Sequence, residues 1–323
     1  MKDTAYAFGT AKVRAVENTL LTKADIEQLI SVKHVSDALR ILSDKGYDTG
    51  MGARSLSKIF GTEREKLWKL MDEVSCGNEF FKIFLYKNDY HNLKVIIKGL
   101  SSGKDFDNML LHPYTVSPEL IKDAVREGKF EILPPIMAEA AAKAYELLNR
   151  SDDTKGACMV IDKASNEALY KGAKESENDF FIELARLMID TANAKIALRC
   201  ARIGLEADEV LKALTDVGGL NVKELAANSA RGFAELAEYL SSTFLAEYVS
   251  LAESDFSAFE KQCDDLVTDK IAKAKYKAFG PEPILAYYFA KEAEIKTLHI
   301  ILAGKMNGLE EDVIRKRVRK LYV

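Results

Sequence analysis

Two segments of the chain carry an aspartate and an asparagine three residues apart. Asp89 and Asn92 form the first pair, and Asp190 and Asn193 form the second. Residues at this spacing share one face of a helix, so each pair places a carboxylate beside an amide within an apolar stripe. Such a pair is usually a structural brace, and direct contact with a partner protein is the alternative. We predict that Asp89 and Asn92 are buried and hydrogen-bonded to neighbouring helix ends or loops.

Other residue types that could do chemistry lack the spacing that chemistry needs. The histidines do not form a pair of metal ligands on one helix face, and they are scattered along the chain at His34, His91, His112 and His299. The glycines over 50–55 follow no strand and precede no Gly-Lys-Ser or Gly-Lys-Thr, so we expect a turn there and no phosphate site. The sequence therefore predicts no catalytic residue, cofactor or metal.

Composition and charge argue against nucleic acid or a membrane interior as a binding partner. The 323 residues carry a net charge of −4, which gives no overall attraction to nucleic acid. No apolar run approaches the roughly 20 residues of a membrane span, and the first residues contain no apolar signal core. Four widely spaced cysteines without a Cys-x-x-Cys motif indicate reduced, buried thiols. We expect a cytosolic protein with no direct membrane insertion.

Helical periodicity extends over almost the whole sequence. The six prolines fall in two short windows, which leaves long uninterrupted segments and predicts an all-α fold with more than about 65% helix. A Thr-Glu-Arg-Glu capping box at Thr62 predicts the start of one helix, and single helices are expected over 222–242 and 308–320. The tract Ala138–Ala144 favours close helix packing, with lining of a cavity as the alternative.

The sequence repeats with a period of about one hundred residues. Asn78–Phe81 recurs as Asn178–Phe181 after 100 residues, whereas Asp89–Ile97 matches Asp190–Leu198 after 101. The same lysine position is filled three times, by Lys94, Lys195 and Lys296. In the third copy Lys291 and Glu294 replace the aspartate and the asparagine. The change of period within a helix would require a π-bulge to keep the faces aligned.

The repeat predicts three helical units, with boundaries at 1–117, 118–219 and 220–323. A repeat this long exceeds that of common helical solenoids, which favours closed or funnel-like packing about a pseudo-threefold axis. In that case the Cα atoms of the three repeated lysines form a roughly equilateral triangle. Three collinear lysines would instead indicate a solenoid.

Several segments together resemble the C subunit of the V-type (archaeal and bacterial A-type) ATPases, which is related to the d subunit of eukaryotic vacuolar ATPases. The resemblance extends from residue 6 to the C-terminus, and its most specific part is the Asn-Asp-x-His-Asn-Leu sequence that begins at Asn88. The segments that carry it are Tyr6–Arg14, Lys87–Lys94, Leu110–Val116 and Ala286–Lys296.

The resemblance implies an all-α funnel of three similar sub-domains on the cytoplasmic face of a membrane rotor ring. Central-stalk subunits would bind at the open end and the ring at the base, and the protein would transmit torque without chemistry of its own. Partner contact or a bracing role would then fall to Asp89, His91, Asn92, Lys94, Asp190, Asn193, Lys195 and Lys296. The resemblance leaves open H⁺ or Na⁺ as the coupling ion, and pumping or synthesis as the direction. The alternative function is a soluble helical scaffold that assembles partners without rotation, and a helical enzyme is the least favoured class.

Overall fold

The computed structural model describes residues 3–50, 56–75, 77, 79–104 and 106–322. Helix accounts for 79% of the chain, and these described residues contain no β-strand. The predicted all-α class, with a helix content above about 65%, is therefore confirmed. Cys76, Asn78 and positions 51–55 of the predicted glycine turn lie outside the described residues.

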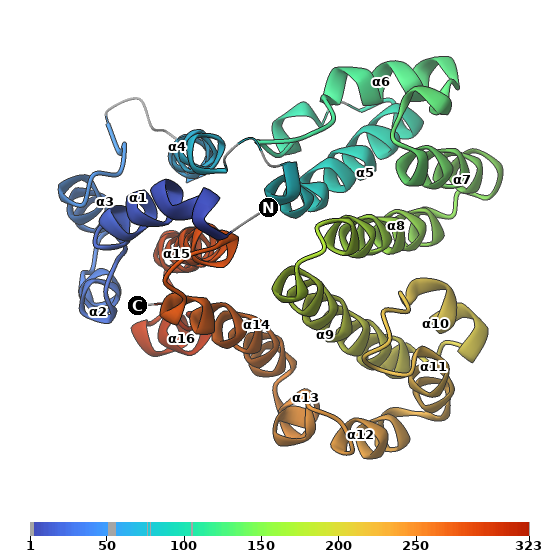
Figure 1. Cartoon of the computed structure of the whole chain (residues 1–323). Coiled ribbons are helices and arrows are strands. Elements are labelled where there is room, and N and C mark those ends of the chain that lie inside the picture. Colours follow the sequence, from blue (N-terminus) through green and yellow to red (C-terminus); the bar gives the residue numbers. More distant parts are fainter. Residues whose placement is uncertain (1–2, 51–55, 76, 78, 105, 323) are drawn as a thin grey trace. The chain divides into compact units, whose positions relative to one another are not determined.

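The chain forms two compact units, whose helices are labelled in Figure 1. The first unit combines Met1–Phe81 with Ser250–Val323, so both ends of the chain belong to it, and the second unit is Lys82–Val249. The three-unit division at residues 117 and 219, and the threefold axis, stay predictions.

The first unit is organised around its longest helix, α15. This helix is buried around most of its circumference, which is typical of a central helix, and it packs against α4 and α1. Tyr288 of α15 lies against Trp68 of α4 with ring centroids 5.3 Å apart. The helices of this unit are η1 (Asp3–Tyr6), α1 (Ala7–Glu17), α2 (Lys23–Ser31), α3 (Val35–Asp44), α4 (Leu56–Val74), α13 (Val249–Ser254, beginning at the unit boundary), α14 (Phe256–Ala272), η6 (Lys273–Tyr276), α15 (Pro281–Met306) and α16 (Glu311–Arg317).

The second unit contains two long helices of the repeat, α5 and α9, with a close helical hairpin between them in the sequence. The hairpin consists of α7 and α8, which are the most extensively packed pair of helices in this unit. Ala140, Ala141 and Ala144 are buried on α7, so the alanine tract serves helix packing. The helices are α5 (Tyr86–Ser102), η3 (Asp107–Met109), α6 (Pro118–Glu127), η4 (Phe130–Ile132), α7 (Pro135–Ser151), α8 (Thr154–Glu175), α9 (Asp179–Ile203), α10 (Ala207–Ala213), α11 (Val222–Arg231), α12 (Phe233–Ser241) and η5 (Ala246–Tyr248), and η2 (Glu79–Leu85) crosses the boundary from the first unit.

The change of repeat period from 100 to 101 residues is compensated by a difference in helix type between the two copies. The first copy enters α5 through the 3₁₀ helix η2, whereas α9 is α-helical from Asp179. A 3₁₀ helix turns about 120° per residue and an α-helix about 100°. Seven 3₁₀ residues therefore give nearly the rotation of eight α-helical residues. The first copy can thus be one residue shorter while the residues that follow stay on the same helix face as their counterparts in the second copy. The described residues of both copies contain no π-helical turn.

Three predicted helix limits differ from the structure. Thr62 lies inside α4, which begins at Leu56 because the buried Ile59 and Phe60 extend its apolar face upstream of the capping sequence. The predicted helix 222–242 breaks at Gly232, whose φ of 132° suits glycine and strains other residues. The third limit is the C-terminal end of α16, which stops at Arg317 and not at 320.

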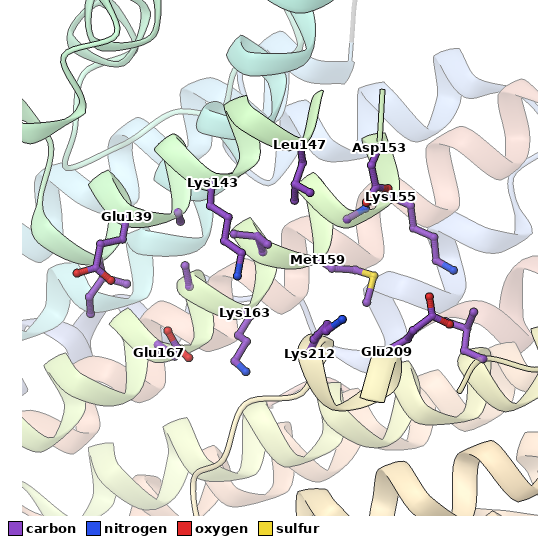
Figure 2. Close-up of a pocket in the computed structure, with 16 residues that line it drawn as sticks. Glu139, Lys143, Leu147, Asp153, Lys155, Met159, Lys163, Glu167, Glu209 and Lys212 are labelled. Atoms are coloured by element: carbon purple, nitrogen blue, oxygen red, sulfur yellow. Dashed lines mark hydrogen bonds between the residues drawn. The ribbon is translucent and has the colours of Figure 1, made fainter. Parts of the chain in front are cut away.

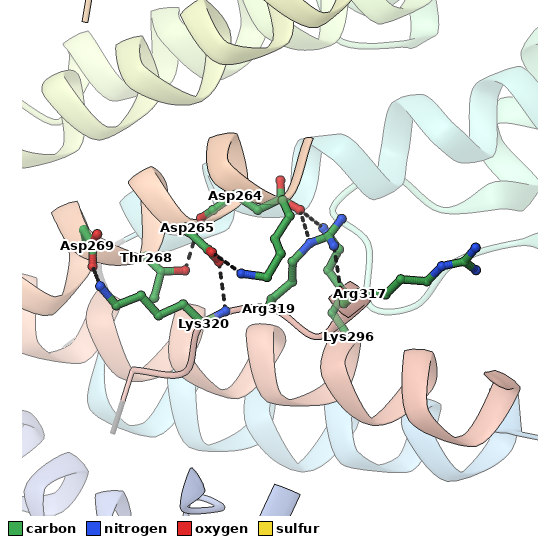
Figure 3. A network of polar contacts seen from close by, with 9 residues as sticks. Asp264, Asp265, Thr268, Asp269, Lys296, Arg317, Arg319 and Lys320 are labelled. Carbon is green, nitrogen blue, oxygen red and sulfur yellow. Dashed lines mark hydrogen bonds and ion pairs between the residues drawn. The ribbon is translucent and has the colours of Figure 1, made fainter. Parts of the chain in front are cut away.

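The segment after α16 is held by aspartates on α14 (Figure 3). Arg319 Nε donates to Asp264 Oδ2 at 2.8 Å, and Lys320 donates its backbone N–H to Asp265 and its ammonium to Asp269. Three carboxylates on consecutive turns of one helix thus neutralise much of the basic C-terminal end. Arg319 and Lys320 thus lie beyond the end of α16 and bind α14 instead.

Candidate functional site

The first predicted pair ties α5 to the loop that leads into α6. Asn92 donates from Nδ2 to the carbonyl of Leu111 at 3.0 Å and accepts from the Leu111 N–H at 2.7 Å. Asp89 accepts from the Thr115 N–H at 2.8 Å, from the Thr115 hydroxyl at 2.5 Å and from the Val116 N–H at 3.2 Å. Both side chains are buried, at 1% and 0% exposure. The predicted burial and hydrogen bonding are confirmed.

The second pair makes the same contacts between α9 and the loop that leads into α11. Asn193 donates to the carbonyl of Thr215 at 2.7 Å and accepts from its N–H at 3.0 Å. Asp190 accepts from the Leu220 N–H at 3.0 Å. An amide that satisfies both polar groups of one residue fixes that residue in position and orientation.

The two pairs agree in register as well as in type. The asparagine-bound residue, Leu111 or Thr215, lies six residues before the N-cap of the next helix, Ser117 or Asn221. Each aspartate binds the N–H of the residue immediately before that N-cap. The connection from helix to loop is three residues longer in the second copy, yet the bonded positions are the same. We call each set of contacts a loop clamp.

In the third copy Glu294, which stands at the asparagine position, makes the contact that the aspartate makes in the other two copies, and it makes it with a different segment of chain. Glu294 of α15 accepts from the Leu21 N–H at 2.5 Å, and Leu21 immediately precedes Thr22, the N-cap of α2. The helix that follows the clamp in space is thus α2, which comes from the other end of the sequence. The N-terminal segment thus supplies the backbone group that Glu294 binds, and both ends of the chain contribute to the first unit.

The third clamp contains an ion pair at the position where the first two clamps use an asparagine amide. Lys291 Nζ lies 2.7 Å from Glu294 Oε1 and 3.5 Å from Glu63 Oε2, and it donates to the Tyr47 hydroxyl at 2.9 Å. Tyr47 in turn donates to Glu294. Burial, reinforced by the charge of Glu294, raises the pKa of Tyr47, so its hydroxyl keeps its proton. The repeat locates Lys291 and Glu294, but Glu63 and Tyr47 have no counterpart in the sequence pattern.

Burial is also the leading influence on the two clamp aspartates. It raises the pKa of Asp89 despite the hydrogen bonds from Thr115 and Val116, which favour the ionised form. It likewise raises the pKa of Asp190, against the N–H of Leu220 and the charge of Arg186.

Two of the repeated lysines form ion pairs outside these clamps. Lys94 pairs with Asp162 of α8 at 2.6 Å and Lys296 with Asp264 of α14 at 2.5 Å, while Lys195 lies half-buried on α9. His91 contacts the carbonyl of Met109 through Nε2 at 3.1 Å, so it extends the first clamp toward η3.

The described residues contain neither a metal-type cluster of side chains nor a membrane-spanning helix. Within the described ranges, no three histidine, cysteine or carboxylate side chains gather as a metal site would require. No described helix is both long enough and apolar enough to cross a membrane. Cys158, Cys200 and Cys263 are free thiols. Cys200 and Cys263 are buried as predicted, whereas Cys158 is half-buried and the prediction of burial is wrong there.

Comparison with known proteins gives one consistent result. The family model described as ATP synthase (C/AC39) subunit matches residues 10–317. The C subunit of the V-type sodium ATPase of Enterococcus hirae is 24% identical over 323 residues, covering 96% of this chain and 97% of that protein. The C subunit of the A-type ATP synthase of Methanocaldococcus jannaschii is 26% identical, with coverage of 96% and 85%. The corresponding C subunit of the V-type ATP synthase of Thermus thermophilus is 23% identical, with coverage of 97% and 98%.

Proposed function

The chain belongs to the ATP synthase (C/AC39) subunit family, and from this premise we propose that it is the rotor coupler of a V/A-type ATPase. The family is one of non-catalytic subunits, so its partners are other subunits of the complex. In this proposal central-stalk subunits bind one end of the chain and the membrane ion-carrying ring binds the other. The protein is then peripheral on the cytoplasmic face, held there through the complex.

The loop clamps are the observation that carries the coupling role. A protein that transmits torque must resist twisting. Long helices joined by flexible loops would rotate relative to one another under load, and the rotation would not reach the next subunit. In both copies of the second unit, buried side chains fix the connecting loop to the long helix at the same two positions. We propose that Asp89, Asn92, Asp190 and Asn193 are structural braces of this kind and make no direct contact with stalk or ring.

The arrangement of the three repeats forms a second part of the proposal. Equivalent clamps on α5, α9 and α15 favour three equivalent units around one axis, with Lys94, Lys195 and Lys296 at corresponding positions. The socket for the stalk would be an axial opening at least about 10 Å wide, the diameter of one helix. An image of the intact complex tests this, and collinear lysines or a filled axis would contradict it.

Reconstitution tests the coupling role directly. Complexes assembled without this chain should hydrolyse ATP through the catalytic head but should not drive ions across the membrane, and adding the purified chain should restore pumping. ATP hydrolysis and ion transport are measured on the same vesicles. Pumping that persists without the chain contradicts the proposal. Recovery of the chain only with partners outside the ATPase would favour the scaffold.

Clamp variants test whether stiffness is what matters. Asn92→Ala combined with Asn193→Ala loosens both clamps of the second unit, so we expect the variant to assemble and the number of ions moved per ATP to fall. Asn228→Ala is a matched control, because Asn228 is half-buried on α11 and, among the described residues, its side chain bonds within its own helix, to the Glu224 carbonyl. An unchanged ratio in a fully assembled double variant would contradict the bracing role.

A further inference from the structure

A groove of about 630 Å³ crosses the second unit between the α7–α8 hairpin and α10. Its floor is apolar and incompletely covered, since the side chains that form it are all half-buried: Ile136, Leu147, Met159, Val160 and Leu205. Along α7 the lining extends from Ile136 to Leu147, which corresponds to about 16 Å of helix. The groove therefore has the length of about three helical turns.

The charges of the groove are ordered along its length, as Figure 2 shows. Lys143, Lys163 and Lys212, which come from three different helices, occupy its middle. Glu139 and Glu167 lie together at one end. The other end carries Lys155 and Glu209, with Asp153 committed to capping α8 through the Gly156 N–H at 2.7 Å.

The three central lysines have no carboxylate partner within the described part of the chain. No ion pair joins Lys143, Lys163 or Lys212 to the acids of the groove, although surface lysines elsewhere are paired, such as Lys94 and Lys122. Three cations that converge on an apolar floor without forming ion pairs are complementary to a ligand that is apolar on one side and acidic beside it.

We propose that this groove binds an amphipathic helix of a partner protein, about three turns long, with acidic residues at its centre. The apolar face of that helix lies on Met159, Val160 and Leu147, and its carboxylates meet the central lysines. A compact anion such as phosphate fits less well, because the lysines are distributed over three helices and the floor offers it no donors. The inference stands independently of the coupling role.

A charge-reversal experiment on the full chain tests the proposal. The probe is a fluorescent synthetic peptide of about 14 residues with leucines on one face and central glutamates beside them, and a second peptide carries lysines in place of those glutamates. Binding is measured by anisotropy at about 50 mM salt, where surface charges are weakly screened. The variant combines Lys143→Glu, Lys163→Glu and Lys212→Glu. The control combines Lys98→Glu, Lys129→Glu and Lys223→Glu, which change the net charge equally outside the groove.

We expect the acidic peptide to bind the wild-type and control chains and to bind the groove variant at least about tenfold more weakly, because three favourable pairs become repulsive. The basic peptide should bind the groove variant better than it binds the wild type. Met159→Glu, which changes only the floor, should also weaken the acidic peptide. Lys212→Glu alone serves if the triple variant does not fold. The proposal is overturned if the acidic peptide does not bind the wild type, or if groove and control variants bind it equally.

Discussion

The clamps of the second unit and the clamp of the first unit solve one problem with different chemistry. In the second unit, an asparagine amide and an aspartate hold a loop that follows in sequence. In the first unit, a glutamate holds a segment 273 residues away and is itself held by Lys291 and Tyr47. The neutral amide suits a loop that forms locally, whereas the distant segment is secured by a charge network in which each member depends on the others.

The largest effect is expected from breaking the charge network. Lys291→Ala leaves Glu294 buried without its cation, while Glu63 keeps Lys66 at 2.6 Å, and Lys291 itself is only 11% exposed. Removing one partner of a buried ion pair costs about 3–5 kcal/mol. We expect a loss of that size in the free energy of unfolding, measured in urea. A loss below about 1 kcal/mol would show that the third clamp is not a buried ionic site.

The amide clamp should be weaker by comparison. Asn193→Ala removes two hydrogen bonds and leaves the N–H and C=O of Thr215 unpaired in the interior. We expect a loss of about 2–3 kcal/mol in urea unfolding, because unpaired buried backbone groups keep their desolvation cost. Asn228→Ala, at a half-buried position, serves as the control and should change the free energy of unfolding by less than about 0.5 kcal/mol.

The caps that follow the clamps should differ in their response to acid. At the start of α2 the N-cap Thr22 is hydrogen-bonded to Asp25. Although burial opposes it, hydrogen bonds from Lys45 and Thr22 lower the pKa of Asp25 to about 2. The N-caps of the other two helices, Ser117 and Asn221, do not titrate. A carboxyl with a lowered folded-state pKa stabilises the fold above its unfolded pKa and loses this contribution as the pH falls through the folded value.

We therefore expect the stability advantage of the wild type over Asp25→Asn to be constant from pH 7 to about 5 and to shrink between about pH 4 and 2. Urea unfolding at each pH measures this difference. Replacing Asn221 by serine, an equally good N-cap, provides the reference and should give a difference that does not vary with pH. A constant difference for Asp25→Asn would contradict the ionic cap.

The smallest effects should come from the repeated lysines. Lys94→Ala and Lys296→Ala each remove one partly exposed ion pair, and such pairs contribute about 0–1 kcal/mol. Their small contribution should decrease further at high salt. If either substitution destabilised the chain as much as Asn193→Ala does, the lysine positions would have to be counted as part of the clamps.

The sequence predicted the clamps of the second unit because both partners of the pattern, Asp89 with Asn92 and Asp190 with Asn193, are side chains at fixed spacing on one helix. The sequence did not predict which groups these side chains bind. Their partners are mainly backbone N–H and C=O groups, which every residue type other than proline carries. The same reason hides the closure of the third repeat by Leu21.

The limits of single helices were predicted less well than their existence. The start of α4 depends on the burial of Ile59 and Phe60, and a four-residue capping pattern at Thr62 does not report burial. The winding of η2 was missed for a similar reason, because a 3₁₀ segment and an α-helix share nearly the same apolar pattern over seven residues.

The closure of the third repeat by α2 also has a consequence for how the chain is made. Leu21 leaves the ribosome 273 residues before Glu294, and Ile30 leaves it 275 residues before Lys305, which donates to its carbonyl. At about 5–20 residues per second, the N-terminal helices wait on the order of tens of seconds for the segments that cover them. The second unit is contiguous and can complete its own clamps during that interval. The apolar faces of α1 to α4 therefore stay uncovered until the segment that carries Glu294 and Lys305 has been made.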